Sequence, residues 1–169
     1  LTDVTAAQKH CETFLANPTN LKHAIAPHLL LTAADAYLQG KTPDPQKSEG
    51  FYRQIVSGFP KHERAPRAQL GIGICLRAQQ KWDAAIKQLT SSEAVFQQPE
   101  LLAESRLLIG QSHLAAKRPP EAVAALRSAI AAKPDWEHVD EIRFVLGVSL
   151  RAAQELDAAI AELKQFNAI

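Results

Sequence analysis

Residues 107–114 have the sequence LLIGQSHL, and similar sequences stand 37 residues earlier, LGIGICL at 70–76, and 37 residues later, FVLGVSL at 144–150. Twelve residues after each central glycine comes an alanine followed by Ile or Val, and a leucine follows that alanine by four residues. Agreement at this many positions indicates an internal repeat of 37 residues. The repeated residues are Gly73, Gly110 and Gly147; Ala85, Ala122 and Ala159; and Leu89, Leu126 and Leu163.

Each copy contains two segments with apolar residues at helical spacing, separated by a short polar break such as Gln154-Glu155. A connection this short makes the second helix return antiparallel to the first. Pro66, Pro99 and Pro119 stand near helix starts, where the missing N–H costs little. Glycine allows the two helix axes to approach closely, and we expect the repeated alanines to face the repeated glycines. We also expect Asp135 to cap the helix from Trp136 onward.

A looser copy lies upstream, with Thr42-Pro43-Asp44-Pro45 as a longer connector because proline is not tolerated inside a helix. Before it, residues 4–15 have helical spacing and form the second helix of a half repeat. The chain also has 29 alanines among 169 residues, which favours helix-on-helix packing. The sequence therefore predicts an all-α fold, a right-handed α-solenoid of antiparallel helix pairs with about nine helices. A single array over 1–169 is expected, with a half repeat at 1–18 and repeats at about 22–60, 62–98, 99–134 and 135–169.

This pattern resembles the tetratricopeptide repeat (TPR), a helix-turn-helix unit with a small residue in its first helix and an alanine on the facing helix. The matching residues in one copy are Gly110, Ala122, Leu126, Ala129 and Pro134. The departures are Pro119 in place of an opening aromatic residue, His113 in place of a large apolar residue, and a period of 37 rather than the common 34. Residues 51–73 are similar to the longer repeats of bacterial envelope proteins, such as the periplasmic repeat protein of the Tol-Pal system and the lipoprotein of outer-membrane barrel assembly. The resemblance favours the bacterial periplasm or envelope over the cytoplasm.

The resemblance implies a concave groove, lined by the first helices, that binds a protein or peptide. The expected groove residues are Arg67, Leu70, Ile74 and Arg77; Glu104, Leu107, Gln111 and Leu114; and Glu141, Phe144, Val148 and Arg151. In this hypothesis the row of Leu70, Leu107 and Phe144 contacts the apolar side chains of a peptide or partner helix, and Arg77 or Arg151 pairs with a carboxylate. The alternative is that these apolar residues are buried between neighbouring first helices or covered by flanking repeats.

The predicted function is that of a non-catalytic interaction or assembly scaffold. One alternative is a substrate-docking or regulatory region of a larger enzyme or envelope complex. Another is a self-association module, a homodimer formed through open array ends. Apolar residues at both ends support this last possibility: Phe14 and Leu15, and Phe166 and Ile169. The chain has no methionine, and we expect it to be an excerpt from a longer array or multidomain protein.

No residue pattern indicates catalysis, a metal or a cofactor. Gly71-Ile72-Gly73 lies within a predicted helix and does not complete a phosphate-binding motif. The densest group of possible metal ligands is His10-Cys11-Glu12 with His23 and His28, but adjacent residues on a helix point in different directions. Cys11 and Cys75 are expected to be free thiols, because a disulfide would have to reach across an intervening repeat.

The charge and hydropathy of the chain exclude two further classes of partner. The net charge is +1, from 19 Lys plus Arg and 18 Asp plus Glu with interspersed signs, so no basic face for nucleic acid is expected. The apolar segments are also too short for a membrane-spanning helix, so this segment is not expected to insert into a membrane.

Overall fold

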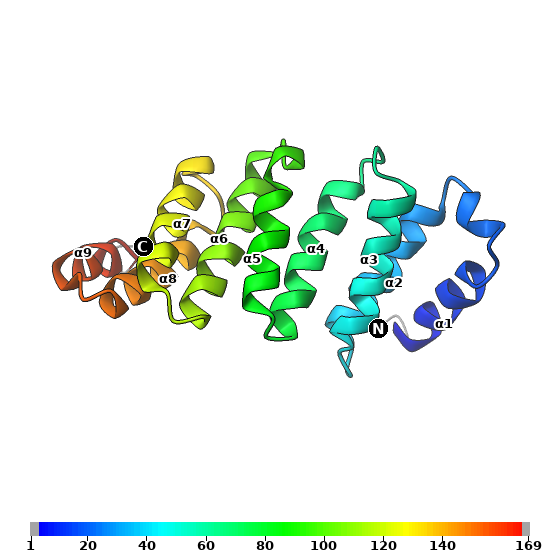
Figure 1. The fold of residues 1–169 in the computed structure, drawn as a ribbon, viewed down its shortest axis with the longest axis horizontal. Coiled ribbons are helices and arrows are strands. Elements are labelled where there is room, and N and C mark those ends of the chain that lie inside the picture. The colour runs from blue at the N-terminus through cyan, green and yellow to red at the C-terminus, as the bar shows by residue number, and fades with distance from the viewer. Residues whose placement is uncertain (1–3, 167–169) are drawn as a thin grey trace. The chain divides into compact units, whose positions relative to one another are not determined.

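The computed structural model describes the backbone of residues 4–166 and the side chains of residues 9–165. The chain forms two compact units, Leu1–Lys81 and Trp82–Ile169 (Figure 1). Over the described residues the regular structure is entirely helical, with nine α-helices, two short 3-10 helices and no strand. The predicted all-α fold with nine helices is therefore confirmed. One continuous array over 1–169 stays a prediction.

The first unit contains four α-helices, each packed against the next one in the chain. They are α1 (Val4–Leu15), α2 (Ala26–Gln39), α3 (Pro45–Gly58) and α4 (Ala65–Ala78), with the 3-10 helix η1 (Asn20–Lys22) between α1 and α2. Helix α3 begins at Pro45 because proline is tolerated in the first turn of a helix. The Asp44 side chain caps this helix by accepting a hydrogen bond from the Lys47 backbone N–H at 2.9 Å.

Tyr52 lies at the centre of the first unit, where α3 meets α4. Its side chain is 2% exposed, and its hydroxyl donates a hydrogen bond to the Asp35 carboxylate on α2. The ring lies directly against Gly71 of α4. A Cβ atom on Gly71 would lie 2.5 Å from Tyr52 Cζ, which is well inside van der Waals contact. Only glycine therefore fits at position 71 without displacing the Tyr52 ring.

The second unit contains five α-helices, again each packed against the next. They are α5 (Trp82–Ser91), α6 (Pro99–Ala115), α7 (Pro119–Ala132), α8 (Val139–Ala152) and α9 (Leu156–Phe166), with the 3-10 helix η2 (Glu93–Val95) after α5. One core cluster joins the last four of these helices. Its buried members are Leu107, Val123, Leu126, Ala129, Ile142, Leu146, Leu150 and Ala159.

The repeated glycines of α6 and α8 make close contacts with the helix that follows, but their main partner is a leucine. A Cβ atom on Gly110 would lie 2.6 Å from Leu126 Cγ, and one on Gly147 would lie 2.7 Å from Leu163 Cγ. The Ala122 backbone oxygen also lies 3.4 Å from this Cβ position of Gly110, as expected for an alanine that faces the glycine. At Gly147 the three nearest atoms all belong to Leu163, so a leucine takes the place expected for Ala159. The same glycine–leucine contact therefore occurs in the α6–α7 pair and, 37 residues later, in the α8–α9 pair.

The turn after the first helix of a pair is also repeated. Lys117 and Gln154 adopt positive φ angles of 60° and 66°. The next residue in each turn bonds back to the last turn of the helix: Arg118 N–H to His113 O and Glu155 N–H to Leu150 O, both at 2.9 Å. This Schellman-type arrangement ends the helix and reverses the chain. Gln80 has a φ of 59° at the equivalent position after α4, 37 residues before Lys117.

Other local expectations are changed by the structure. Helix α8 begins at Val139, so Asp135 is not its cap. The Asp135 carboxylate instead forms an ion pair with Lys133, whose Nζ lies 2.9 Å away. Leu15 is 8% exposed and offers no open apolar surface. The Phe166 side chain and Ile169 lie outside the described residues.

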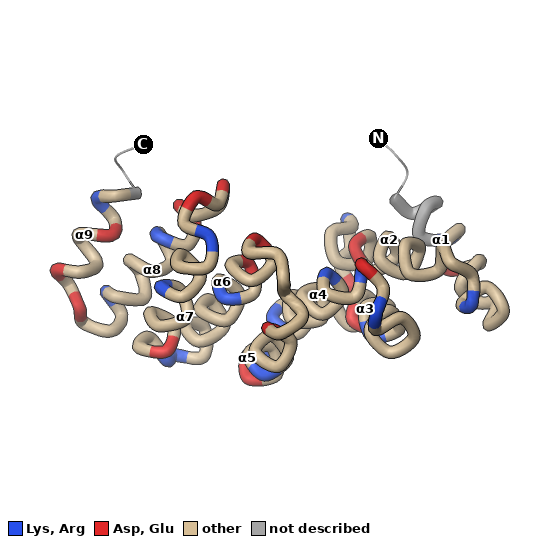
Figure 2. The backbone as a smooth tube through the Cα atoms, turned by 90° about the horizontal axis from the view of Figure 1, so that it is seen from above, with Lys and Arg blue, Asp and Glu red and all other residues tan. Residues whose placement is uncertain are grey.

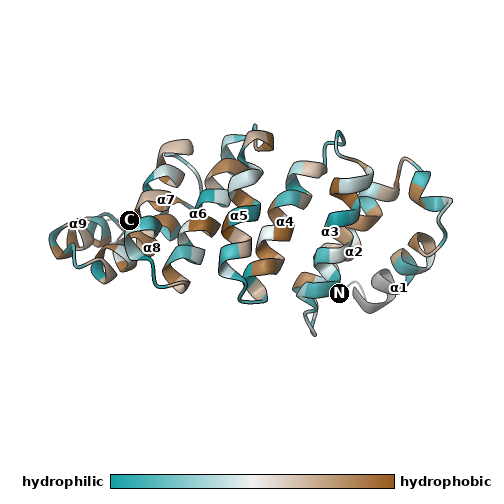
Figure 3. Ribbon diagram, in the orientation of Figure 1, coloured by the Kyte–Doolittle hydropathy of each residue, from teal (hydrophilic) through white to brown (hydrophobic). Residues whose placement is uncertain are grey.

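Charged residues are distributed over the helices of both units. Both units carry Lys and Arg as well as Asp and Glu (Figure 2). Several pairs link neighbouring elements of the second unit, among them Arg106–Glu93 at 3.3 Å and Arg143–Glu162 at 3.0 Å. Each described helix also mixes apolar and polar residues (Figure 3). This mixture is typical of helices that bury one face and expose the other.

Replacing Gly71 by alanine should destabilise the chain, whereas the same change at Gly50 should stabilise it. Alanine is the better helix former by about 1 kcal/mol at either position. At position 71 the new methyl group collides with the Tyr52 ring, at a cost of about 1–3 kcal/mol that exceeds this gain. Gly50 lies in α3 of the same unit with no atom within 4 Å of its missing Cβ. Urea unfolding followed by circular dichroism measures both variants, and equal stabilisation of the two would contradict the role given to Gly71.

Candidate functional site

A hollow of about 310 Å³ lies between α6 and α8 in the second unit. Its lining side chains are Gln111, Leu114 and Ala115 from α6, and Phe144, Val145 and Val148 from α8. Residues three or four apart lie on the same face of a helix, so each helix contributes one face to the hollow. Apart from the Gln111 amide, the lining consists of apolar side chains. Phe144 is 49% exposed, which is high for so large an apolar residue.

Four of the six lining residues were predicted from the sequence: Gln111, Leu114, Phe144 and Val148. The other two, Ala115 and Val145, were missed. Ala115 follows Gln111 by four residues, and this spacing could have identified it. Val145 is next to Phe144 and lies partly in the core, so a one-face pattern does not select it.

Polar groups stand next to this hollow on both helices. Gln111 Nε2 donates a hydrogen bond to Glu141 Oε1 at 3.0 Å and so links α6 to α8. Arg151 follows Phe144 by seven residues and therefore shares its face of α8. Its side chain is exposed and forms no ion pair with any residue that the structure describes. Glu104, another predicted residue of this unit, is half-buried on α6 and does not line the hollow.

The predicted apolar row of Leu70, Leu107 and Phe144 does not form an exposed surface. Leu70 is fully buried in the first unit, and Leu107 is 4% exposed within the core cluster of the second. Their inclusion among partner-contacting residues is therefore corrected, since neither side chain is accessible. For these two residues the alternative, burial between helices, describes the structure.

The remaining predicted residues lie on α4 in the first unit. Arg67, Ile74 and Arg77 are each half-buried there. The structure thus brings four predicted residues together in the second unit, with Glu141 and Arg151 close by in sequence on α8. The role of the α4 residues in binding stays a prediction.

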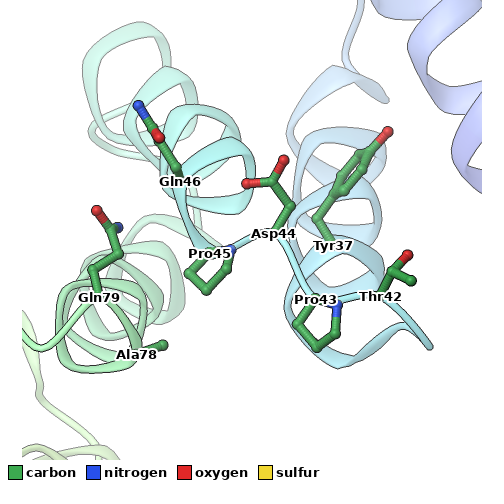
Figure 4. Close-up of a pocket in the computed structure, with 8 residues that line it drawn as sticks. All are labelled: Tyr37, Thr42, Pro43, Asp44, Pro45, Gln46, Ala78 and Gln79. Carbon is green, nitrogen blue, oxygen red and sulfur yellow. The ribbon is translucent and has the colours of Figure 1, made fainter.

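The first unit has a more open hollow of about 600 Å³, where the connector before α3 meets the end of α4 (Figure 4). Three of its polar side chains already form hydrogen bonds to residues outside the lining. Gln79 Nε2 donates to Glu49 Oε2 at 2.7 Å, and the Asp44 carboxylate caps α3. The Tyr37 hydroxyl donates to Glu12 Oε1 at 2.6 Å and accepts from Lys47 Nζ at 2.7 Å. These bonds link the connector to the helices beside it and engage the Tyr37, Asp44 and Gln79 side chains.

Lys47 and Glu12 form an ion pair beside this connector, and each group favours the charged form of the other. Hydrogen bonds from Lys47 and Tyr37 lower the pKa of Glu12, and the bonds to Glu12 and Tyr37 raise the pKa of Lys47 to about 12. Both groups remain charged near neutral pH. Since Lys47 and Glu12 are both partly exposed, the pair contributes little to stability.

The described residues show no arrangement suited to metal binding or thiol chemistry. Among the side chains of residues 9–165 no three from His, Cys, Asp or Glu converge as metal ligands, including those around His10 and Cys11. Cys11 and Cys75 are buried free thiols. Burial raises the pKa of Cys11, and burial raises that of Cys75 to about 11, so both stay protonated and unreactive. None of the described helices has the length and apolar character needed to cross a membrane.

Comparison with protein families shows to which family the repeat belongs. The tetratricopeptide-repeat model matches residues 77–136 and again residues 107–166, which together cover more than half of the chain. The chain belongs to the tetratricopeptide-repeat family. Members of this family bind protein partners, and membership supports a general protein-binding role for this TPR chain. No curated protein sequence matches it.

Solved structures share this TPR-like solenoid fold. Apo RapI has a TM-score of 0.84 at 15% identity over 98% of this chain, which spans 63% of the length of RapI. The TPR-like repeats of a putative kinesin light chain from Podosopora anserina have a TM-score of 0.77 at 16% identity, covering 98% of this chain and 84% of that one. MamA from Desulfovibrio magneticus RS-1 has a TM-score of 0.69 at 15% identity, covering 98% and 94%. At these identities the likeness concerns the fold.

His113 should make the second unit less stable in mild acid. Burial lowers the pKa of His113 below its usual 6.5 and Arg118 lowers it further, against the opposite effects of Glu121 and Asp83. The buried Nδ1 atom has no hydrogen-bond partner among the described residues. As the pH falls through about 6.5, the unfolded chain gains a proton that folded His113 takes up only at lower pH, so folding stability decreases.

The variant His113→Leu removes this proton uptake. The unfolding free energy, measured in urea at about pH 7 and about pH 5, should fall less for the variant than for the natural chain. Equal losses in the two proteins would show that His113 does not contribute.

Proposed function

We propose that this chain is a non-catalytic interaction module that binds a peptide or partner helix by enclosing an apolar side chain in the α6–α8 hollow. The observation that carries the proposal is the hollow itself, an apolar surface between two packed helices that already exposes half of Phe144. Exposed apolar surfaces with polar surroundings are typical of protein-interaction sites.

The size of the hollow favours a side chain over a cofactor. Its volume of about 310 Å³ is at the lower end of the range of roughly 300–1,000 Å³ for small-molecule pockets. Gln111 is the single polar side chain in the lining, so few groups could orient a cofactor. An apolar anchor such as Leu or Phe needs no such groups, and its burial contributes about 1.5–3 kcal/mol.

The charges beside the hollow favour one polarity of the bound segment. Glu141 stands near the start of α8 and Arg151 near its end, with Phe144 and Val148 between them. An acidic residue next to the anchor is therefore attracted toward Arg151 and repelled from Glu141. Because Arg151 is exposed, this pair contributes at most about 1 kcal/mol and mainly sets the direction of the segment.

A selection of phage-displayed random peptides against the whole chain tests the proposal. We expect enriched peptides to carry a large apolar residue with an acidic residue nearby. Val148→Asp places a carboxylate in the hollow and should weaken binding of these peptides by about tenfold or more, since the anchor loses its burial. Fluorescence anisotropy with a labelled peptide measures the change.

Val95→Asp is the matched control, because Val95 is an apolar residue of the same unit, 43% exposed, and lies on η2 away from the hollow lining. This variant should bind the peptides as the natural chain does. Failure to enrich any peptide, or equal binding to Val148→Asp with its helix content intact by circular dichroism, would refute the proposal.

A further inference from the structure

Helix α9 exposes two large apolar side chains on adjacent turns. Leu156 is 59% exposed and Ile160 is 52% exposed, and their spacing of four residues puts them on the same face. Lys164 continues this row by four more residues and is also exposed. Leu156, Ile160 and Lys164 are called the α9 face below.

The repeat identifies the equivalent surface on α7. Ile160 follows Val123 by 37 residues, and Leu163 follows Leu126 by 37. Leu163 contacts Gly147 as Leu126 contacts Gly110, so α9 sits on α8 in the same rotation as α7 sits on α6. Yet Val123 is 4% exposed where Ile160 is 52% exposed. The difference arises because α8 packs against α7, in the core cluster that joins Val123 to Ile142 and Leu146.

Helix α8, which packs on α7, indicates what kind of helix fits the equivalent α9 face. Its buried residues Ile142, Leu146 and Leu150 are spaced by four, and none is more than 1% exposed. Glu155 follows Leu150 by five residues and lies 3.9 Å from the Arg127 guanidinium on α7. Lys164 stands 37 residues after Arg127 and so presents a positive charge at the equivalent place on α9.

We propose that the α9 face binds an amphipathic helix of a partner protein, in the manner in which α7 binds α8. The bound segment carries apolar residues at helix positions i, i+4 and i+8, which cover Ile160. An acidic residue five positions after the last of them lies in the turn that ends the helix, as Glu155 does after α8, and pairs with Lys164. This site is separate from the α6–α8 hollow, and a partner can contact either surface alone.

A peptide with the sequence of residues 139–155, which is α8 and the turn after it, is the probe. Because an isolated helix of this length is marginal in water, the peptide is stapled between positions 140 and 144, away from Ile142 and Leu146. Fluorescence anisotropy measures its binding to the whole chain, and backbone NMR shifts locate it. We expect binding, with the largest shifts in α9.

Ile160→Glu should weaken this binding by about tenfold or more, because it places a charge within the apolar contact. Lys164→Glu should weaken it by a smaller factor that grows at low salt. Val95→Glu, at another exposed apolar residue of the unit, and Val148→Asp, in the hollow, should leave it unchanged. A peptide with Ser at the positions of Ile142 and Leu146 should not bind.

Three results would overturn the proposal. They are absence of binding by the stapled peptide, binding that Ile160→Glu does not affect, and shifts confined to the α6–α8 hollow. Sedimentation of the chain alone adds a fourth: a dimer that Ile160→Glu dissociates would assign the α9 face to a second copy instead of a partner helix. The Val148→Asp result separates a failure here from a failure of the proposed function.

Discussion

The structure depends on a close approach between the two helices of each pair in the second unit. Gly110 and Gly147 have no side chain, and the space this leaves is filled by Leu126 and Leu163 of the following helix. Since a Cβ at these positions would overlap the leucine, this close approach of the two helices requires glycine. The contact places the second helix in a similar way in both pairs, together with the core cluster around it.

The turn between the two helices of a pair also favours their close packing, through its backbone conformation. Gln80, Lys117 and Gln154 each adopt a positive φ, a conformation that costs a residue with a side chain about 1 kcal/mol or more. The cost is offset by the hydrogen bonds that satisfy the last carbonyls of the helix, such as Arg118 N–H to His113 O. These residues are not glycines, so composition gives no sign of the conformation. The three positive-φ residues repeat at the same spacing of 37 residues as the glycines and alanines of the sequence repeat.

Much of the fold could be predicted because apolar periodicity and helix-breaking residues are local properties of the sequence. The helix count, the antiparallel pairs and the α1 bounds follow from apolar spacing, prolines and short polar breaks. The start of α8 could not be predicted, because Asp135 has two possible partners nearby and bonds with Lys133 instead of a helix N-terminus. The contact of Gly71 with Tyr52 also has no local signal, since it joins residues of two different helices.

The candidate site was predicted only in part because the repeat assigns equivalent positions without assigning equal exposure. Leu107 and Phe144 occupy the same place in successive repeats, yet Leu107 is 4% exposed and Phe144 is 49% exposed. Val123 and Ile160 show the same contrast on the second helices. In each pair the residue type is similar, and what differs is the helix that packs over it. Exposure in a stacked repeat therefore depends on the neighbouring helix, and comparing equivalent positions within one chain shows which apolar faces are uncovered and what kind of helix covers the equivalent face.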